Sequence, residues 1–351
     1  MPFPSITFLL PGDNRSGGVR VTAVMGNLLL ARGYSVRVAH PAVWHRWWEE
    51  PTRLLTLLPS AHEGWLHTFK GPMVAYSDVN RLSFAPGEIV IGVGTYMIPD
   101  LHSLRARDIV KVRYNHGFPA RMTAAYRAAW SLPIPTITVS PTLVPQLEAL
   151  SGQKVRAVIP NGIDPAEYYP VDSGPRDAIG TIFSLHPNKA PADIVRLLQR
   201  VGAVFPDVPR VVFSTERRPP ELAGCHYERA PSIARVRELY SRAMIWLLAS
   251  QTEGLPGPVL EAMACGAVVI STDNAGSLAV IKDRRNGLIV PRGDCEAFIE
   301  SIQKVRDSEA LRTRLTRGGF DTVARFTWPC AADRMEAFLA SVSSHALRLS
   351  A

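Results

Sequence analysis

Short runs of β-branched and aliphatic residues alternate with stretches of helical periodicity along the whole chain. In the first half the runs are SITFLL at 5–10, SVRVAH at 35–40, EIVIGVG at 88–94, DIVKVRYN at 108–115 and TITVS at 136–140. In the second half they are DAIGTIFSL at 177–185, RVVFST at 210–215, MIWLLAS at 244–250 and AVVIST at 267–272. Strands that alternate with helices pair in parallel and are covered on both faces. The pattern therefore predicts doubly wound, parallel-sheet α/β domains.

The segment between the first two runs shows the helical pattern most clearly. Its apolar residues recur on one face of a helix, and they are Val21, Val24, Met25, Leu28 and Leu29. Gly33 follows the last of them and is predicted to end the helix, because glycine readily adopts the left-handed conformation of a C-cap.

The length of 351 residues exceeds one ordinary hydrophobic core and fits two domains. The segment VIPNGIDPAEYYPVDSGPRD at 158–177 is rich in Pro, Gly and Asp and is the predicted boundary. We therefore predict Rossmann-like domains at 1–160 and 161–328. Ligands of open α/β sheets bind beyond the carboxyl ends of the strands, so we expect the site in a cleft between the two domains.

The positive charge is concentrated in the first half of the chain. Residues 1–160 hold 16 Lys and Arg against 9 Asp and Glu, whereas residues 161–351 hold 23 against 22. This asymmetry suggests an anionic partner for the first half, such as a membrane surface, a phosphorylated lipid carrier or an acidic saccharide. The alternative is a solvated basic face. Nucleic acid is not expected, since no nucleic-acid-binding module accompanies the charge.

Composition and segment lengths favour a globular protein of the cytoplasm. Hydrophobic residues make up 46% and charged residues 20%, which is an ordinary globular balance. No apolar run is long enough to span a bilayer, and the start MPFPSITFLLPGD is predicted to be a strand rather than a signal peptide. The four cysteines, Cys225, Cys265, Cys295 and Cys330, have neither metal-ligand nor disulfide-framework spacing.

Three candidate features follow predicted strands. Gly17 and Gly18 precede a helix, whose N-terminal amides favour anions. His116 directly follows the run at 108–115. Lys189 stands just before a helix that Pro191 begins, where its charge and the helix amides suit a diphosphate. Each feature alone also has a plain structural interpretation: a glycine turn, a structural histidine, a solvated lysine.

The fourth feature is the loop SQTEGLPG at 250–257, which leaves the strand at 244–250. Glu253 is expected to project into the cleft from this loop, and amides near Leu255 and Gly257 are expected to point the same way. Glu261 lies about two helical turns further along, too far in sequence to form an acid–base pair with Glu253 on one helical face.

The segment EGLPGPVLEAMACGAVVISTDNAGSLAVIKDRRNGLIVPRGD, from 253 to 294, resembles the signature of the family 4 retaining glycosyltransferases, the glycogen-synthase-like GT-B enzymes. VIPNGIDPAEYYP is similar to the interdomain segment of that family, and SGGVRVTAVMGNLLLARGYSVRV to its opening loop and helix. RFTWPCAADRMEAFLASV resembles its closing helix, which crosses back to the first domain. The resemblance implies an acceptor-binding domain at 1–160, a donor-binding domain at 161–328 and a crossing helix within 329–351.

The resemblance also implies roles for single residues. Glu253 would contact the hydroxyls of the donor sugar, His116 would lie near the reacting sugar, and Lys189 would hold the diphosphate. Glu261 would bind the nucleotide ribose. The other residues implied in donor binding are Gly17, Gly18, Ser184, Ser232, Leu255, Pro256 and Gly257.

One position departs from the family pattern. The family usually has a Gly-Arg pair five residues before the lysine, and here Phe183 and Ser184 stand in those positions. A phosphate-neutralising charge is therefore missing. Either His186 or another basic residue replaces it, or donor binding is unusual or weaker.

Transfer from a nucleoside diphosphate sugar develops negative charge on the leaving diphosphate, where lysine and helix amides can stabilise it. The resemblance implies chemistry without a cofactor or a metal, in keeping with the lack of an Asp-x-Asp motif. It also implies a retaining reaction on one face of the sugar, which needs no nucleophile and acid pair of the glycosidase kind.

The acceptor side is less defined. Trp44, Trp47 and Trp48 fall on one helical face, which suits a saccharide platform or a membrane contact, and packing against the sheet is the alternative. Tyr96 is a further acceptor candidate.

The leading hypothesis is thus a retaining transferase that moves a hexosyl or deoxyhexosyl group to a saccharide, lipid-linked or small-molecule acceptor. The alternatives are a GT-B nucleotide-sugar epimerase and a non-catalytic nucleotide-sugar-binding protein, the latter supported by Ser184.

Overall fold

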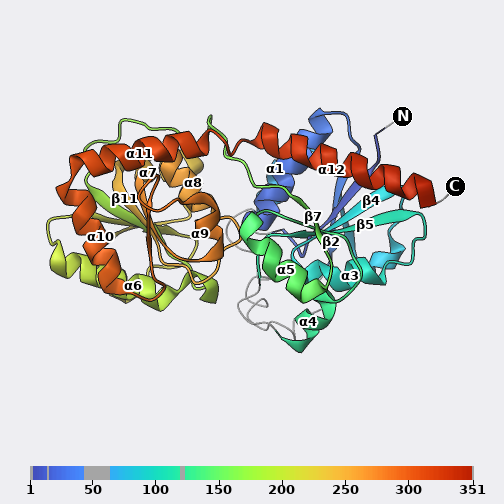
Figure 1. The fold of residues 1–351 in the computed structure, drawn as a ribbon, viewed down its shortest axis with the longest axis horizontal. Coiled ribbons are helices and arrows are strands. Elements are labelled where there is room, and N and C mark those ends of the chain that lie inside the picture. Colours follow the sequence, from blue (N-terminus) through green and yellow to red (C-terminus); the bar gives the residue numbers. More distant parts are fainter. Residues whose placement is uncertain (1–2, 14–15, 43–63, 119–122, 350–351) are drawn as a thin grey trace. The chain divides into compact units, whose positions relative to one another are not determined.

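The computed structural model describes residues 3–13, 16–42, 64–118 and 123–349. The chain divides into two compact units. Unit 1 comprises Met1–Asn161 and Trp328–Ala351, and unit 2 comprises Gly162–Thr327. Each unit is a parallel α/β sheet covered by helices (Figure 1), so the predicted fold class is confirmed.

Unit 1 contains a seven-stranded sheet in the order β3-β2-β1-β4-β5-β6-β7. Its strands are β1 (Ile6–Leu9), β2 (Val36–Pro41), β3 (Met73–Tyr76), β4 (Glu88–Val93), β5 (Ile109–Asn115), β6 (Thr136–Thr138) and β7 (Val155–Val158). Its α-helices are α1 (Gly17–Ala31), α3 (Ile98–Ser103), α4 (Ala124–Trp130), α5 (Val144–Ser151) and α12 (Trp328–Leu349). Its short 3-10 turns are η2 (Trp65–Thr68), η3 (Val79–Arg81), η4 (Thr95–Met97) and η5 (Pro141–Leu143).

The helices of unit 1 cover opposite faces of its sheet. Helices α1 and α12 lie together on one face, and α3, α4 and α5 lie on the other (Figure 1). An ion pair joins the first two, since Arg32 after α1 contacts Asp333 of α12 at 2.8 Å and also pairs with Glu336. The closing helix therefore packs within unit 1, although the chain reaches it from unit 2.

Unit 2 contains a six-stranded sheet in the order β10-β9-β8-β11-β12-β13. Its strands are β8 (Ala178–Ile182), β9 (Arg210–Ser214), β10 (His226–Arg229), β11 (Ala243–Leu248), β12 (Val268–Thr272) and β13 (Leu288–Val290). Its α-helices are α6 (Pro191–Val204), α7 (Ile233–Arg242), α8 (Gly257–Ala264), α9 (Ala275–Val280), α10 (Cys295–Asp307) and α11 (Glu309–Val323), with 3-10 turns η6 (Pro187–Lys189) and η7 (Pro220–Leu222).

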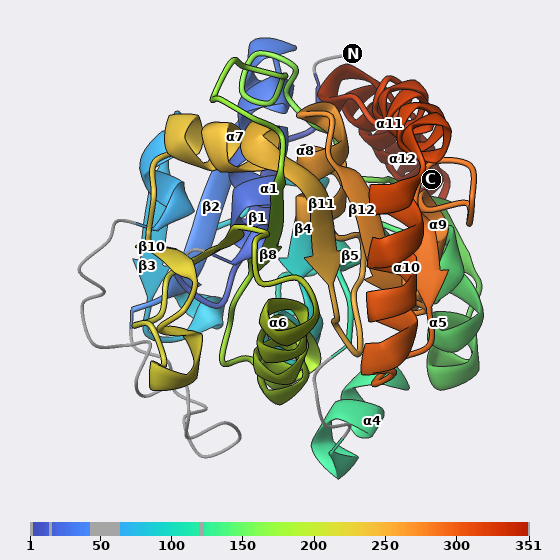
Figure 2. The same cartoon turned by 90° about the vertical axis from the view of Figure 1, so that its left-hand side faces the viewer.

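Helices α6 and α10 cover one face of this sheet, and α7, α8 and α11 cover the other (Figure 2). The core between the first pair of helices and the sheet is aliphatic, with Ile194, Leu198 and Val201 of α6 against Ile245 and Leu247 of β11. Because both faces are buried, the central strands are continuous apolar runs rather than alternating ones.

Both sheets reverse their strand order at one point, between β1 and β4 in unit 1 and between β8 and β11 in unit 2. At such a switch point the two flanking loops diverge and leave room for a ligand beyond the carboxyl ends of the strands. We call the side of each sheet where the strands end its carboxyl edge, and the other side its amino edge.

Candidate active site

The loop after β8 brings Lys189 to the carboxyl edge of unit 2. His186 caps the turn η6, and its ring Nδ1 accepts a hydrogen bond from the backbone N–H of Asn188 at 3.2 Å. Ala190 then adopts a left-handed conformation with φ 51°, and Pro191 begins α6. A left-handed residue other than glycine is strained by about 1–3 kcal/mol and is most often found at functional sites. This sharp turn separates the Lys189 side chain from the helix that follows.

The loop after β11 holds Glu253 against Lys189. The Lys189 ammonium Nζ lies 2.6 Å from Glu253 Oε1, and the hydroxyl of Ser250 donates to the same oxygen at 2.6 Å. The backbone N–H of Gln251 donates to the carbonyl of Asn188 at 2.8 Å, which ties the two loops together. The Glu253 side chain is only 9% exposed. Its charge is therefore balanced by a cation and a hydroxyl, as a largely buried carboxylate requires.

A second layer of residues supports Glu253 from behind. The hydroxyl of Thr272, at the end of β12, donates to the carbonyl of Ser250 at 2.5 Å. Asn274 caps α9, and its side-chain oxygen accepts from the backbone N–H of Ser277 at 3.0 Å. A Cβ atom at Gly276 would lie 2.6 Å from Glu253 Cβ and 2.8 Å from its carbonyl. Only glycine fits there, because real Cβ contacts do not come so close.

Glu261 lies on α8 and has its own partner. The hydroxyl of Tyr240 donates to Glu261 Oε2 at 2.9 Å. Tyr240 is fully buried and its ring meets that of Trp246 edge to face, 4.4 Å apart. Burial, and secondly the charge of Glu261, raise the pKa of the Tyr240 hydroxyl well above its usual value. Tyr240 therefore stays protonated and remains a hydrogen-bond donor to the carboxylate.

The turn between the two glutamates is compact. Leu255 and Pro256 are buried, and α8 begins at Gly257 without a side-chain cap. A Cβ atom at Gly257 would lie 3.5 Å from Glu261 Oε1. The start of α8 therefore lies close to the Glu261 carboxylate.

Two serines expected to bind the donor carry local hydrogen bonds in the structure. The hydroxyl of Ser232 accepts from the backbone N–H of Arg235 at 3.2 Å and caps α7. The hydroxyl of Ser184 accepts from the backbone N–H of His186 at 3.2 Å. Both residues stabilise turns at the carboxyl edge.

In unit 1 the structure brings Gly18 and His116 together. Gly17 and Gly18 begin α1 after β1, and a Cβ atom at Gly18 would lie 3.9 Å from His116 Nδ1. His116 follows β5 and its ring meets that of Tyr114 edge to face at 4.3 Å. Tyr96, in η4 after β4, packs edge to face on Tyr126 at 5.4 Å.

His116 is held in its neutral form. Although part of the residue is exposed, its Nε2 atom is buried and has no hydrogen-bond partner among the described residues. Burial lowers the pKa of the imidazole to about 3. A buried polar atom without a partner calls for a ligand or a water, and the depressed pKa removes His116 from proton transfer near neutral pH.

The structure does not describe every residue that the sequence pointed to. Trp44, Trp47 and Trp48, the predicted acceptor face, lie outside the described residues. Within the described ranges, no group of three or more His, Cys, Asp or Glu side chains is placed to hold a metal ion. No helix in the part of the chain that the structure describes is long and apolar enough to cross a membrane.

Ser250, Tyr240 and Gly276 are among the supporting residues that the sequence patterns missed. Ser250 stands at the end of an apolar run, and its spacing to Glu253 is the one signal that could have suggested it. Tyr240 and Gly276 carry no local signal, since their partners are 21 and 23 residues away in the sequence.

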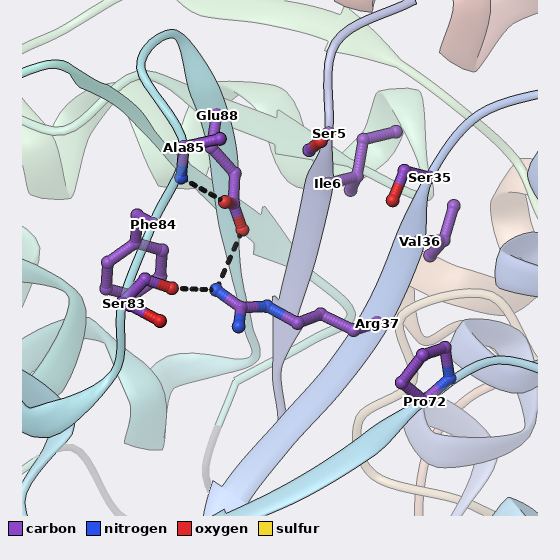
Figure 3. A pocket seen from close by; sticks show the side chains of 10 residues that line it. All are labelled: Ser5, Ile6, Ser35, Val36, Arg37, Pro72, Ser83, Phe84, Ala85 and Glu88. Carbon is purple, nitrogen blue, oxygen red and sulfur yellow. Dashed lines mark hydrogen bonds and ion pairs between the residues drawn. The ribbon is translucent and has the colours of Figure 1, made fainter.

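The amino edge of unit 1 carries a separate pocket of about 420 Å³ (Figure 3). Arg37 crosses it and pairs with Glu88 at 3.0 Å while donating to the carbonyl of Ser83 at 2.6 Å. The other oxygen of Glu88 accepts from the backbone N–H of Ala85 at 2.8 Å. Since its charges are satisfied internally, this pocket is a structural junction of the first strands.

Comparison with known proteins shows which family this chain resembles. Residues 229–321 match the family model of glycosyl transferases group 1. The chain is 35% identical over 121 residues to the lipopolysaccharide core biosynthesis glycosyltransferase LpsE of Rhizobium meliloti, a match that covers 34% of each chain. The chain thus spans about a third of the length of that curated relative.

Two solved structures share the fold over nearly the whole chain. A sucrose-phosphate synthase from Thermosynechococcus elongatus superimposes with a TM-score of 0.76 at 16% identity, covering 97% of this chain and 100% of that one. The Anabaena protein HepE, solved in complex with UDP and glucose, superimposes with a TM-score of 0.75 at 13% identity, covering 96% and 100%. The expected resemblance and the GT-B fold are confirmed.

Proposed function

We propose that this chain, a relative of the group 1 glycosyl transferases with a GT-B fold, moves a hexosyl or deoxyhexosyl group from a nucleoside diphosphate sugar to a saccharide, lipid-linked or small-molecule acceptor with retention. The observation that carries the proposal is the ion pair of Lys189 and Glu253 at the switch point of unit 2. Both side chains come from loops that leave neighbouring strands at their carboxyl ends, where open α/β sheets bind ligands.

The Lys189 ammonium is suited to the leaving diphosphate. It has three N–H donors, and one of them is directed at Glu253 Oε1. The remaining donors can bind phosphate oxygens, and their charge would stabilise the negative charge that develops as the glycosidic bond breaks. No metal is assigned a part in this step.

Glu253 is suited to the sugar. Its Oε1 accepts from both Lys189 and Ser250, whereas Oε2 accepts no hydrogen bond from the described residues. Oε2 can therefore accept from a sugar hydroxyl while Oε1 keeps the side chain fixed. Because two donors and the close approach of Gly276 hold Glu253, the carboxylate is preorganised before the donor binds.

Glu261 is proposed to bind the ribose hydroxyls, with Tyr240 fixing the orientation of its carboxylate. Support for a nucleotide-sugar donor comes from HepE, which was solved with UDP and glucose.

His186 is proposed to compensate in part for the arginine that Ser184 replaces. Its Nδ1 accepts a backbone hydrogen bond, so the neutral ring carries its proton on Nε2 and can donate it to a phosphate. A neutral donor attracts a diphosphate less than a guanidinium does. We therefore expect weaker donor affinity than two cations would give.

His116 would serve as a neutral hydrogen-bonding group rather than as a base. The pKa of about 3 keeps the ring uncharged throughout the physiological range. Its Nε2, which has no hydrogen-bond partner among the described residues, could bond a hydroxyl of the donor sugar. Deprotonation of the acceptor would then fall to the leaving phosphate.

The test is a panel of UDP-, GDP- and dTDP-sugars with candidate acceptors, analysed for transferred and for epimerised sugar. With the active donor, Glu253→Ala should lower turnover by about 100-fold or more, since it removes a contact to the reacting sugar. The matched control is Glu148→Ala, which breaks the surface pair of Glu148 with Lys154 at 2.8 Å and should leave turnover unchanged.

Circular dichroism would establish that both variants fold. Full activity in folded Glu253→Ala would overturn the assignment of the site. Donor binding without transfer to any acceptor would favour a nucleotide-sugar-binding protein, and an epimerised donor would favour the epimerase.

A further inference from the structure

A groove of about 920 Å³ lies on unit 2 between α11 and the segment that precedes β13. Because residues 282–286 lead directly into the first residue of β13, the groove lies at the amino edge of the sheet. Lys189 and Glu253 follow the ends of β8 and β11, at the carboxyl edge. The groove is therefore separate from the proposed donor site.

The lining of the groove is strongly basic. Its charged side chains are Lys282, Arg285, Arg314, Arg317 and Arg325, against only Glu309 and Asp321. The excess of three positive charges is larger than the net charge of the whole second half of the sequence, where 23 Lys and Arg stand against 22 Asp and Glu. Positive charge is thus gathered in one concave place on an otherwise balanced unit.

All five of these cations are exposed. Within the described part of the chain, none of the five has a carboxylate within ion-pair distance. By contrast, Arg200 reaches Glu296 at 2.8 Å. Like charges that share a concavity repel one another and raise the local positive potential. A bound anion would remove that repulsion.

The walls of the groove are fixed by the fold. Asn286 is buried, and its side-chain amide donates to the hydroxyl of Thr322 on α11 at 2.7 Å and to the carbonyl of Val280 at 2.9 Å. A Cβ atom at Gly318 would lie 2.1 Å from the carbonyl oxygen of Arg285. Glycine at 318 therefore allows the helix to approach the loop and sets the arginines of both walls around one space.

We infer that this groove binds a soluble polyanion of the phosphate class, with two or more phosphate groups. Its volume falls within the range of small-molecule sites, about 300–1,000 Å³. Neutralising three charges in so small a space requires a dense anion, and a phosphate monoester carries roughly 1.5–2 charges at pH 7. Guanidinium groups bind phosphate oxygens through two parallel hydrogen bonds.

A flat anionic membrane fits this surface less well. The site is concave, and its lining contains no Trp, Tyr, Phe or Leu side chain that could enter a lipid interface. The inference does not depend on the proposed transferase activity, because it uses none of the donor-site residues.

The test titrates tripolyphosphate into the full chain by calorimetry at low ionic strength. Lys189→Ala serves as the background in every sample, so that the proposed diphosphate site contributes little. We expect one saturable site, weakened by roughly tenfold or more in Arg314→Gln/Arg317→Gln, since each change removes a charge-assisted hydrogen bond. Glutamine preserves helix propensity at these exposed positions.

The control pair Arg284→Gln/Lys304→Gln removes the same net charge from exposed positions outside the groove, where the side chains pair with Asp283 and Glu300. It should change the affinity by less than about twofold, because screened surface charges act weakly over a distance. An equal loss of tripolyphosphate affinity in the two double variants would mean that net charge alone controls binding. That result, or the absence of saturable binding, would overturn the proposed site.

Sedimentation with phosphatidylglycerol vesicles provides the second arm. Vesicle binding that Arg314→Gln/Arg317→Gln abolishes, without tripolyphosphate binding, would make the surface a membrane contact and also overturn the inference.

Discussion

The carboxyl edges of the two units are built from the same kind of sheet but bring different side chains together. In unit 2, loops from adjacent strands join a lysine and a glutamate at 2.6 Å, and a buried tyrosine holds a second glutamate at 2.9 Å. In unit 1, the corresponding loops bring together a pair of glycines and a histidine that burial keeps neutral. In unit 2 the two side chains are charged and bonded to each other, whereas in unit 1 the histidine is neutral and its buried Nε2 has no partner among the described residues.

This difference shows that two sheets of the same topology can present different chemistry at their carboxyl edges. A charged group gains most when its partners are fixed beforehand, because reorganisation is then avoided when the ligand arrives. A neutral group can instead leave its hydrogen bond to be completed by the ligand. Under the proposed function, unit 2 would hold the charged donor and unit 1 would contribute neutral contacts.

The largest expected effect comes from breaking the ion pair of unit 2. Lys189→Ala should lower turnover by about 100- to 1,000-fold, because it removes the cation next to the leaving diphosphate. Lys154→Ala is the matched control, since Lys154 forms an equivalent pair with Glu148 at 2.8 Å on the surface of unit 1. Steady-state kinetics with the active donor measures both. Similar losses of turnover in the two variants would show that the ion pair of unit 2 has no special role in turnover, which would contradict the comparison between the units.

The second-largest effect is expected from a substitution at Gly276, where unit 2 has no space for a side chain. Gly276→Ala would place a methyl group 2.6 Å from Glu253 Cβ, so the Glu253 loop must shift. We expect about a 10- to 100-fold loss of turnover, since displacement of about 1 Å at a site has that order of effect. We also expect a loss of about 1–3 kcal/mol in unfolding free energy from overpacking, measured by urea denaturation. An unchanged turnover would mean that the position of Glu253 does not matter.

A third prediction concerns the neutral histidine of unit 1. Its pKa falls from 6.5 to about 3 on folding, so the unfolded chain binds more protons between these values. His116 therefore contributes stability that is complete above pH 6.5 and is lost as the pH falls towards 3. Between pH 7.5 and 5 the free energy of unfolding should therefore fall by about 2 kcal/mol. Most carboxylates titrate below this range.

His116→Gln should lack this loss, whatever its stability at pH 7.5, and urea unfolding at the two pH values measures the difference. Equal slopes in the native protein and the variant would show that His116 is not held neutral by the fold. The pH dependence of turnover between 6 and 9 should also be the same in both proteins, because the ring does not titrate there.

The smallest effect on the fold is expected at Gly18. A Cβ atom there would meet only ordinary contacts, at 3.9 Å from His116 Nδ1, and Ala favours helices by up to about 1 kcal/mol over Gly. Gly18→Ala should therefore leave unfolding free energy unchanged or slightly raised while it weakens donor binding, which titration with the active nucleotide sugar would detect. A folded variant with full donor affinity would remove the glycine pair from the proposed site.

The sequence patterns located the central strands of both sheets and missed the outer ones. The strands without a predicted run are β3 and β7 in unit 1 and β10 and β13 in unit 2, and these are the two outermost strands of each sheet. An outer strand pairs on one side only and is short and partly exposed, so its apolar pattern is weak. Residues 226–229, HYER, contain no aliphatic side chain.

The donor-site candidates in unit 2 could be identified because each follows a recognisable strand or lies within a distinctive motif. Chain order alone shows that Lys189 and Glu253 both follow strand ends. Only the strand order of the sheet places β8 beside β11, and therefore the two side chains in contact. The groove of five cations could not be predicted at all, since Lys282 and Arg325 are 43 residues apart.

The sequence by itself determined the parallel α/β class, the central strands and the residue types available at the strand ends, because these depend on local periodicity and composition. The tertiary structure decided which of those residues meet, which atoms are buried and which charges lack a partner. It neutralised His116, bound Tyr240 to Glu261 and left Arg314 and Arg317 of α11 without a carboxylate partner among the described residues. These outcomes depend on contacts between segments distant in the chain, and burial and pairing are properties of such contacts alone.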